Sequence, residues 1–81
     1  MIKRLEIRTD DTCKTCHVAI DELVPLANQH GIPIVISNPL ETDEFIPVVC
    51  FIEELDGYQK KTCLEGYSDN TKELVEMFIK S

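Results

Sequence analysis

Tryptophan is absent from this sequence, and other aromatic residues are scarce, with three Phe and two Tyr among 81 residues. Basic residues are also few, because eight Lys and Arg stand against 15 Asp and Glu, which gives a formal net charge of −7. Nucleic acids and anionic membrane surfaces are bound through clusters of Lys and Arg. The composition therefore predicts that neither nucleic acid nor membrane is a partner.

Long apolar stretches are missing as well. The longest uninterrupted ones, IPIVI and IPVVCFI, are far shorter than the roughly 20 residues of a membrane span. The first residues, MIKRLEIR, lack the apolar segment of a signal peptide. No repeat or linker divides the chain, and its length suits one small domain, residues 1–81. We therefore expect a soluble, cytoplasmic, monomeric single-domain protein.

Four cysteines are present, and two of them, Cys13 and Cys16, stand two residues apart with His17 directly after them. In a reducing compartment, cysteines indicate metal binding or redox chemistry more than a disulfide framework. The pattern suits a redox dithiol, half of a zinc site or a c-type haem attachment. Haem attachment requires export, and a zinc site requires Cys50 and Cys63 as further ligands at a spacing that matches no second knuckle. Buried small side chains are a further interpretation, which fits an exposed helix start poorly.

The predicted elements follow the order strand, helix, strand, loop, hairpin, helix. RLEIR alternates polar and apolar residues, as a strand with one dry face does. A helix is expected from Lys14 to about His30, with a kink or a division at Pro25. IPIVI is a second strand, and SNPLETDE is too short for more than one helical turn. Asp56-Gly57 between two strand-like runs predicts a hairpin.

A final helix is capped by SDN and carries one apolar face, formed by Leu74, Val75, Phe78 and Ile79. The first strand–helix–strand unit should be right-handed, which makes its two strands parallel. The predicted fold class is therefore α/β, with a mixed four-stranded sheet and both helices on one face. The other face, which carries Arg4, Glu6 and Arg8, is expected to be thinly covered.

Cys13 opens the predicted first helix, where unpaired N–H groups and the helix dipole stabilise a thiolate. Cys16 lies one turn further along and can attack a mixed disulfide that Cys13 forms. Lys14 and a charged His17 would favour the Cys13 thiolate, whereas the two aspartates before it would oppose it. Redox chemistry is the favoured interpretation of the motif.

The arrangement of these motifs resembles the thioredoxin/glutaredoxin superfamily over nearly the whole chain. A CxxC opens a helix after a first strand, Ile46-Pro47 begins a later strand, and Gly66 stands between the hairpin and the terminal helix. The resemblance implies a minimal thioredoxin-like fold whose middle helix is reduced to a loop or a single turn. It also implies that Pro47 is cis and lies against the CxxC, and that the backbone of Ile46 binds a substrate chain.

The sequence departs from this family in three places, because Thr12 replaces an aromatic residue, Lys14-Thr15 separate the cysteines, and Glu65-Gly66 stand where glutaredoxins have two glycines. The resemblance nevertheless implies a dithiol–disulfide oxidoreductase with Cys13 attacking and Cys16 resolving. The residues expected to bind the substrate are Lys14, Thr15, Ile46, Pro47, Gly66 and Tyr67. No cofactor or metal is expected, and electrons would come from a reductase or a low-molecular-weight thiol and pass to a protein or small-molecule disulfide. The alternative is a non-enzymatic thioredoxin-fold module that binds a partner or holds zinc through its cysteines.

The remaining cysteines lie in the predicted hairpin, whose register places Cys50 opposite Cys63. This is a non-hydrogen-bonded position, where Cα atoms approach to ~4.5 Å and a cross-strand disulfide is geometrically feasible. Both side chains would point away from the helices. The preferred interpretation is two small side chains packed under the segment 37–45, since free cysteines are commonly buried. His30 is expected at a helix end, with no chemical role.

Overall fold

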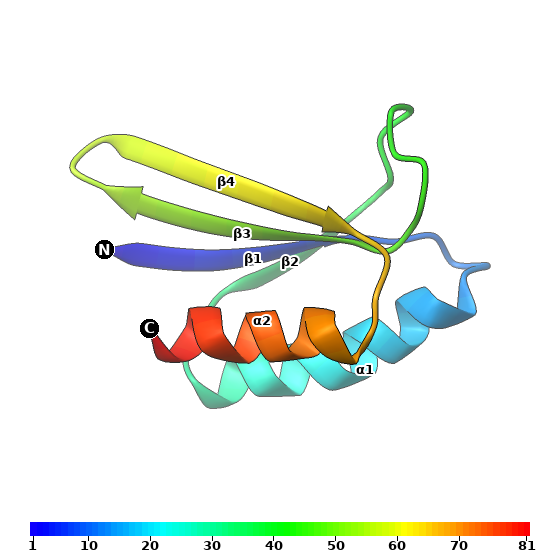
Figure 1. The fold of residues 1–81 in the computed structure, drawn as a ribbon, viewed down its shortest axis with the longest axis horizontal. Helices are drawn as coiled ribbons and strands as arrows, with labels where there is room; N and C mark the ends of the chain where they lie inside the picture. The colour runs from blue at the N-terminus through cyan, green and yellow to red at the C-terminus, as the bar shows by residue number, and fades with distance from the viewer.

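The computed structural model describes all residues, 1–81, as a four-stranded mixed sheet with two helices on one face (Figure 1). The elements are β1 (Ile2–Arg8), α1 (Lys14–Gln29), β2 (Ile34–Ser37), β3 (Val48–Leu55), β4 (Tyr58–Glu65) and α2 (Asp69–Lys80). The strand order is β2-β1-β3-β4, with β1 parallel to β2 and the other two pairs antiparallel. The predicted α/β class and the predicted order of elements are confirmed. Neither helix has the length and the apolar character needed to cross a membrane.

Alternation along β1 separates the two faces of the sheet. Leu5 and Ile7 are fully buried on the helix side. They belong to a core cluster that also contains Leu23, Ala27, Val49, Val75 and Ile79. The opposite face, called the open face below, carries Arg4, Glu6, Cys50, Glu54, Lys61 and Cys63.

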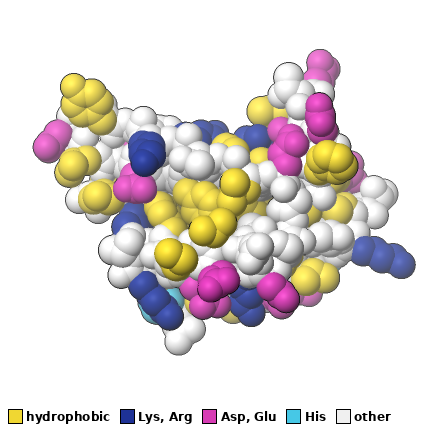
Figure 2. Space-filling model, in the orientation of Figure 1, with side chains coloured by type: hydrophobic (Ala, Val, Ile, Leu, Met, Phe, Trp, Pro, Cys, Tyr) yellow, Lys and Arg dark blue, Asp and Glu magenta, His cyan; other side chains and the backbone are white.

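One residue of the predicted α2 face lies outside the core. Val75 and Ile79 are buried, but Leu74 is 44% exposed. The reason is that α2 packs against α1 and β3, whereas Leu74 lies on the side of the helix that lines a shallow pocket with β4. Figure 2 shows hydrophobic side chains gathered in this region between β4 and α2, where Leu74, Phe51 and Phe78 line a shallow pocket.

Of the two expected effects of Pro25, a kink or a division, the division does not occur, because α1 continues through Pro25 to Gln29. Proline removes one helical hydrogen bond and crowds the preceding turn. Leu23 and Ala27, on either side of it, are both fully buried in the core cluster. Their burial holds both parts of the helix against the sheet and offsets the local cost of the proline.

The connection between β2 and β3 forms no helix, as predicted. Residues 38–47 form turns and loop that rise above the open face, opposite the helices (Figure 1). Asp43 shapes this connection, because its backbone N–H donates to the Leu40 carbonyl at 3.0 Å and its carboxylate accepts the Leu40 N–H at 2.8 Å. Because β3 starts at Val48, directly after this connection, the loop determines where Ile46 and Pro47 lie.

The β3–β4 hairpin turns at Asp56-Gly57, as predicted, with φ of +49° and +83°. Positive φ at both central residues is characteristic of the tight two-residue turn that suits the twist of paired strands. Leu55 then pairs with Tyr58, and every later pair follows from it, including Cys50 with Cys63. The predicted register is therefore confirmed.

Candidate functional site

Cys13 and Cys16 form a disulfide at the start of α1, with their Cα atoms 5.2 Å apart. Cys13 is the N-cap residue of the helix, and its Sγ accepts a hydrogen bond from the Cys16 N–H at 3.1 Å. Cys16 is fully buried, whereas Cys13 is half-buried. A reagent in solvent therefore reaches the sulfur of Cys13 before that of Cys16.

The side chains of Asp10 and His17, on either side of this turn, are held by local contacts. The carboxylate of Asp10 accepts hydrogen bonds from the N–H and the hydroxyl of Thr12, at 3.0 and 2.9 Å, and these hold its pKa below the ordinary value. The ring of His17 contacts the Asp11 carbonyl, with Nε2 at 3.0 Å from its oxygen. No acidic residue lies in the first turn of α1, so the helix N-terminus keeps its positive end.

Ile46, Pro47 and Gly66, predicted from distant parts of the sequence, meet beside Cys13. The Cys13 sulfur lies 3.9 Å from the carbonyl oxygen of Ile46, and the Ile46-Pro47 peptide is cis, as the resemblance implied. Pro47 is fully buried, and its carbonyl accepts the Gly66 N–H at 2.8 Å. Gly66 has φ of +84°, a conformation that residues with a Cβ rarely adopt. These contacts join the segments before β3 and after β4 to the CxxC turn.

The other three predicted substrate-binding residues, Lys14, Thr15 and Tyr67, line a separate surface pocket along the first turns of α1. The hydroxyl of Tyr67 donates to the carboxylate of Glu22 at 2.6 Å. Burial and this hydrogen bond raise the pKa of Tyr67, which stays protonated as a donor. The structure thus places the six candidates in two groups, one beside the Cys13 sulfur and one along the helix.

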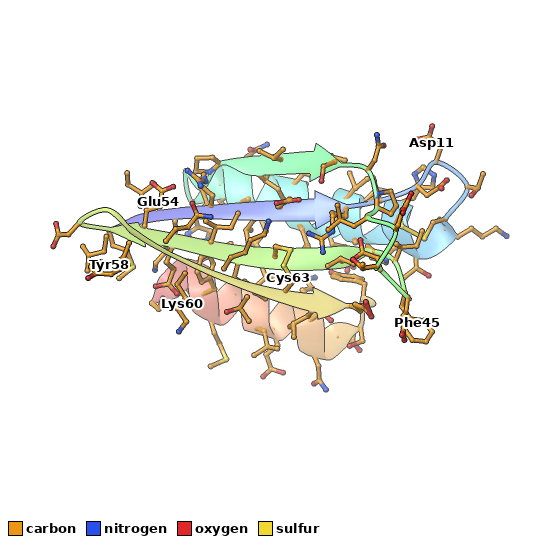
Figure 3. All side chains as sticks on the ribbon, turned by 90° about the horizontal axis from the view of Figure 1, so that it is seen from above. Asp11, Phe45, Glu54, Tyr58, Lys60 and Cys63 are labelled. Atoms are coloured by element: carbon orange, nitrogen blue, oxygen red, sulfur yellow. A yellow bond between two sulfur atoms is a disulfide. The ribbon has the colours of Figure 1, made fainter.

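Sequence reasoning missed the ion pair that anchors the loop before Ile46. Arg8 is only 7% exposed, and its guanidinium donates to both carboxylate oxygens of Asp43, at 2.9 and 3.1 Å. The two residues are far apart in the sequence, and the only available signal was the predicted placement of Arg8 on a thinly covered face. Phe45 was also missed, and its side chain is 66% exposed directly beside Ile46 (Figure 3).

The pH dependence of the free energy of unfolding tests the contribution of the Arg8–Asp43 ion pair. Hydrogen bonds from Arg8 and from the Leu40 N–H hold the pKa of Asp43 below its ordinary value of 3.8. Because the folded state binds this proton more weakly than the unfolded chain, the ion pair adds stability above that value, which is lost as pH falls through the lower folded pKa. We therefore expect the wild-type free energy of unfolding to fall more steeply than that of Asp43→Asn between about pH 5 and about pH 2. Urea unfolding at a series of pH values measures both slopes, and parallel curves would contradict the prediction.

The four cysteines form two separate pairs. Cys50 and Cys63 form the second disulfide, with Cα atoms 4.0 Å apart on the open face of the hairpin. The preferred interpretation of two packed, unpaired side chains is therefore wrong, because the confirmed register brings them directly together and Cys63 is exposed. A four-cysteine zinc site requires the hairpin cysteines to meet the CxxC, and they do not. No three His, Cys, Asp or Glu side chains gather as metal ligands.

The start of α1 thus combines a reachable sulfur, a second sulfur buried one turn behind it, and a backbone carbonyl beside the first. This arrangement is suited to opening and closing one disulfide without a metal or an added group. No protein-family model and no curated protein matches the sequence.

Proposed function

We propose that the protein is a dithiol–disulfide oxidoreductase with a thioredoxin-like fold, in which Cys13 attacks and Cys16 resolves. One observation carries the proposal: the half-buried Cys13 sulfur caps α1 beside the Ile46 carbonyl, with Cys16 fully buried behind it. Exchange needs one sulfur that a substrate can reach and a second that only the first sulfur meets. The strand order and the placement of both helices on one face support the fold assignment.

In the reduced protein, the Cys13 thiolate attacks one sulfur of a substrate disulfide. A Cys13–substrate bond forms, the substrate bond breaks, and its electron pair leaves on the other substrate sulfur. Cys16 then loses its proton and attacks the Cys13 sulfur, which forms Cys13–Cys16 and releases the second substrate thiolate. The substrate gains two electrons, and its two thiolates take up protons from solvent. The Cys16 N–H and the positive end of α1 favour the attacking thiolate.

The substrate class that suits this surface is a disulfide-containing polypeptide. Ile46 and Pro47 would support its extended backbone, and the exposed side chains of Phe45 and Leu40 offer apolar contacts on the same loop. Lys14, Thr15, Gly66 and Tyr67 would contact the flanking segments. A reductase or a low-molecular-weight thiol would return electrons to Cys13–Cys16, and the protein itself needs no cofactor.

Reduction of insulin tests the proposal. We expect the protein to accelerate insulin reduction by dithiothreitol, and Cys13–Cys16 to equilibrate with a glutathione redox buffer as a two-electron couple. Turbidity of the insulin B chain and alkylation of quenched samples measure the two quantities. A protein whose Cys13–Cys16 pair is reduced but which does not accelerate insulin reduction would instead be a binding module, the alternative function.

A further inference from the structure

The second disulfide, Cys50–Cys63, joins β3 to β4, whereas Cys13 and Cys16 lie at the start of α1. Cys50 pairs with Glu6 of β1 and with Cys63 of β4 on the open face, where the Glu6 carboxylate accepts hydrogen bonds from Lys61 and Ser37. The proposed function makes no use of this disulfide. Two features of this disulfide suit a redox site, namely the unequal exposure of its two cysteines and the contact of Arg8 with Cys50.

The two sulfurs differ in their access to solvent. Cys50 is fully buried, whereas Cys63 is exposed on the edge strand. Figure 3, which looks down on the open face, shows Cys63 near the middle of that face. An attacking thiolate therefore meets Cys63, and Cys50 becomes the leaving group. The identity of the attacked sulfur is one determinant of exchange rates.

Arg8 lies against the sulfur that would leave. Its Nη1 donates to Cys50 Sγ at 3.5 Å, and its other nitrogens are held by Asp43. Glu6, Lys61 and Glu65 are further charged groups on this part of the face, so Arg8 and Lys61 stand against the carboxylates of Glu6, Asp43 and Glu65. Of these groups, Arg8 is the one in direct contact with the Cys50 sulfur. A thiolate next to Arg is stabilised, and a leaving thiol with a lower pKa leaves faster.

We propose that Cys50–Cys63 is a second redox-active disulfide that reacts with low-molecular-weight thiols at Cys63. A thiolate attacks Cys63 Sγ, forming a mixed disulfide, while the Cys50–Cys63 bond breaks and its electron pair stays on Cys50 beside Arg8. A second thiolate attacks the small-molecule sulfur of that mixed disulfide and releases Cys63. Two small thiols lose two electrons and form one disulfide, and the two cysteines gain those electrons and the two protons.

The site is tested in the Cys13→Ser/Cys16→Ser double variant, where only Cys50–Cys63 exchanges, so the result does not depend on the proposed function of the CxxC. Reduced and oxidised glutathione are the probe. We expect a reversible gain of two free thiols per chain at increasing glutathione ratio, and a glutathione adduct on Cys63 in quenched samples. Alkylation and peptide mass spectrometry locate the adduct. An adduct on Cys50, or reduction that requires denaturant, would overturn the proposal.

The role of Arg8 is tested by Arg8→Gln in the same background. Reduction by glutathione should slow about tenfold, since the leaving thiolate loses its charged hydrogen bond. Lys61→Gln removes an equal charge from the same face without touching Cys50 Sγ and should change the rate less than about twofold. Equal slowing in both variants would overturn the role of Arg8.

A measurement that keeps Arg8 in place covers the case in which Arg8→Gln unfolds. The triple variant Cys13→Ser/Cys16→Ser/Cys63→Ser has Cys50 as its single thiol, and thiolate absorbance follows its titration. We expect the Cys50 pKa below the ordinary value of about 8.5. A value at or above it would show that burial outweighs Arg8 and would overturn this part of the proposal.

Discussion

Replacing Cys13 with serine should lower the rate of disulfide exchange on insulin by about 10³-fold or more, because the serine hydroxyl is neither an effective nucleophile at neutral pH nor able to form the mixed disulfide. The fold should survive, since Cys13 is only half-buried and a serine hydroxyl also caps a helix. The rate of insulin reduction and the circular dichroism spectrum measure both expectations. Retention of full activity would overturn the assignment of the nucleophile.

The matched variant Cys16→Ser makes the same substitution one turn further along α1. Cys13 then keeps its reactivity but lacks the thiol that resolves the mixed disulfide. We expect Cys16→Ser to accumulate a covalent substrate adduct that is visible on a non-reducing gel, whereas Cys13→Ser should form none at this site. If the adduct accumulated in Cys13→Ser instead, Cys16 would be the attacking cysteine and Cys13 the resolving one. Adducts that map to Cys63 belong to the second disulfide and are distinguished by peptide mapping.

Truncation of Leu23 should produce the largest loss of stability. Leu23 is fully buried in α1 and belongs to the core cluster with Val49 and Val75. Leu23→Ala removes this burial and leaves a cavity, which costs about 2–5 kcal/mol in the free energy of unfolding. Small domains hold a single modest core, so we expect a lowering of the midpoint temperature by roughly 10 °C or more. Thermal unfolding with both disulfides oxidised measures the change.

Val18→Ala is the control on the same helix. Val18 is 49% exposed, so its truncation removes little buried surface and should change the free energy of unfolding by less than about 0.5 kcal/mol. A similar loss in both variants would mean that α1 is stabilised by its own sequence and not by packing on the sheet. Such a result would also contradict our explanation of why the helix continues through Pro25.

The order of the elements was predictable because it depends on local patterns. The alternation in RLEIR reports the two faces of β1, and Asp56-Gly57 marks the hairpin turn. A two-residue turn determines every later pair in the hairpin, so the position of Cys50 opposite Cys63 followed from the sequence. The CxxC at a helix start was equally local, since one N-terminal turn contains both cysteines.

The errors concern residues whose state depends on distant neighbours. A kink or a division at Pro25 was expected from local propensity, and the division does not occur because burial of the residues on both sides against the sheet outweighs the lost hydrogen bond. Leu74 has the right helical spacing for the core, yet it lines a shallow surface pocket with β4 and stays exposed. Free cysteines were preferred in the hairpin because burial is their usual state, whereas the strand edge exposes Cys63.

The sequence by itself thus determined the strands, the helices, the hairpin register and the motif at the start of α1. Only the tertiary structure decided that Cys13 lies beside Ile46, that Arg8 holds Asp43, and that Arg8 also contacts the Cys50 sulfur. Periodicity and turn chemistry act over a few residues, whereas these contacts join segments that are more than 30 positions apart. Their formation depends on the path of the whole chain, and both proposed redox sites depend on them.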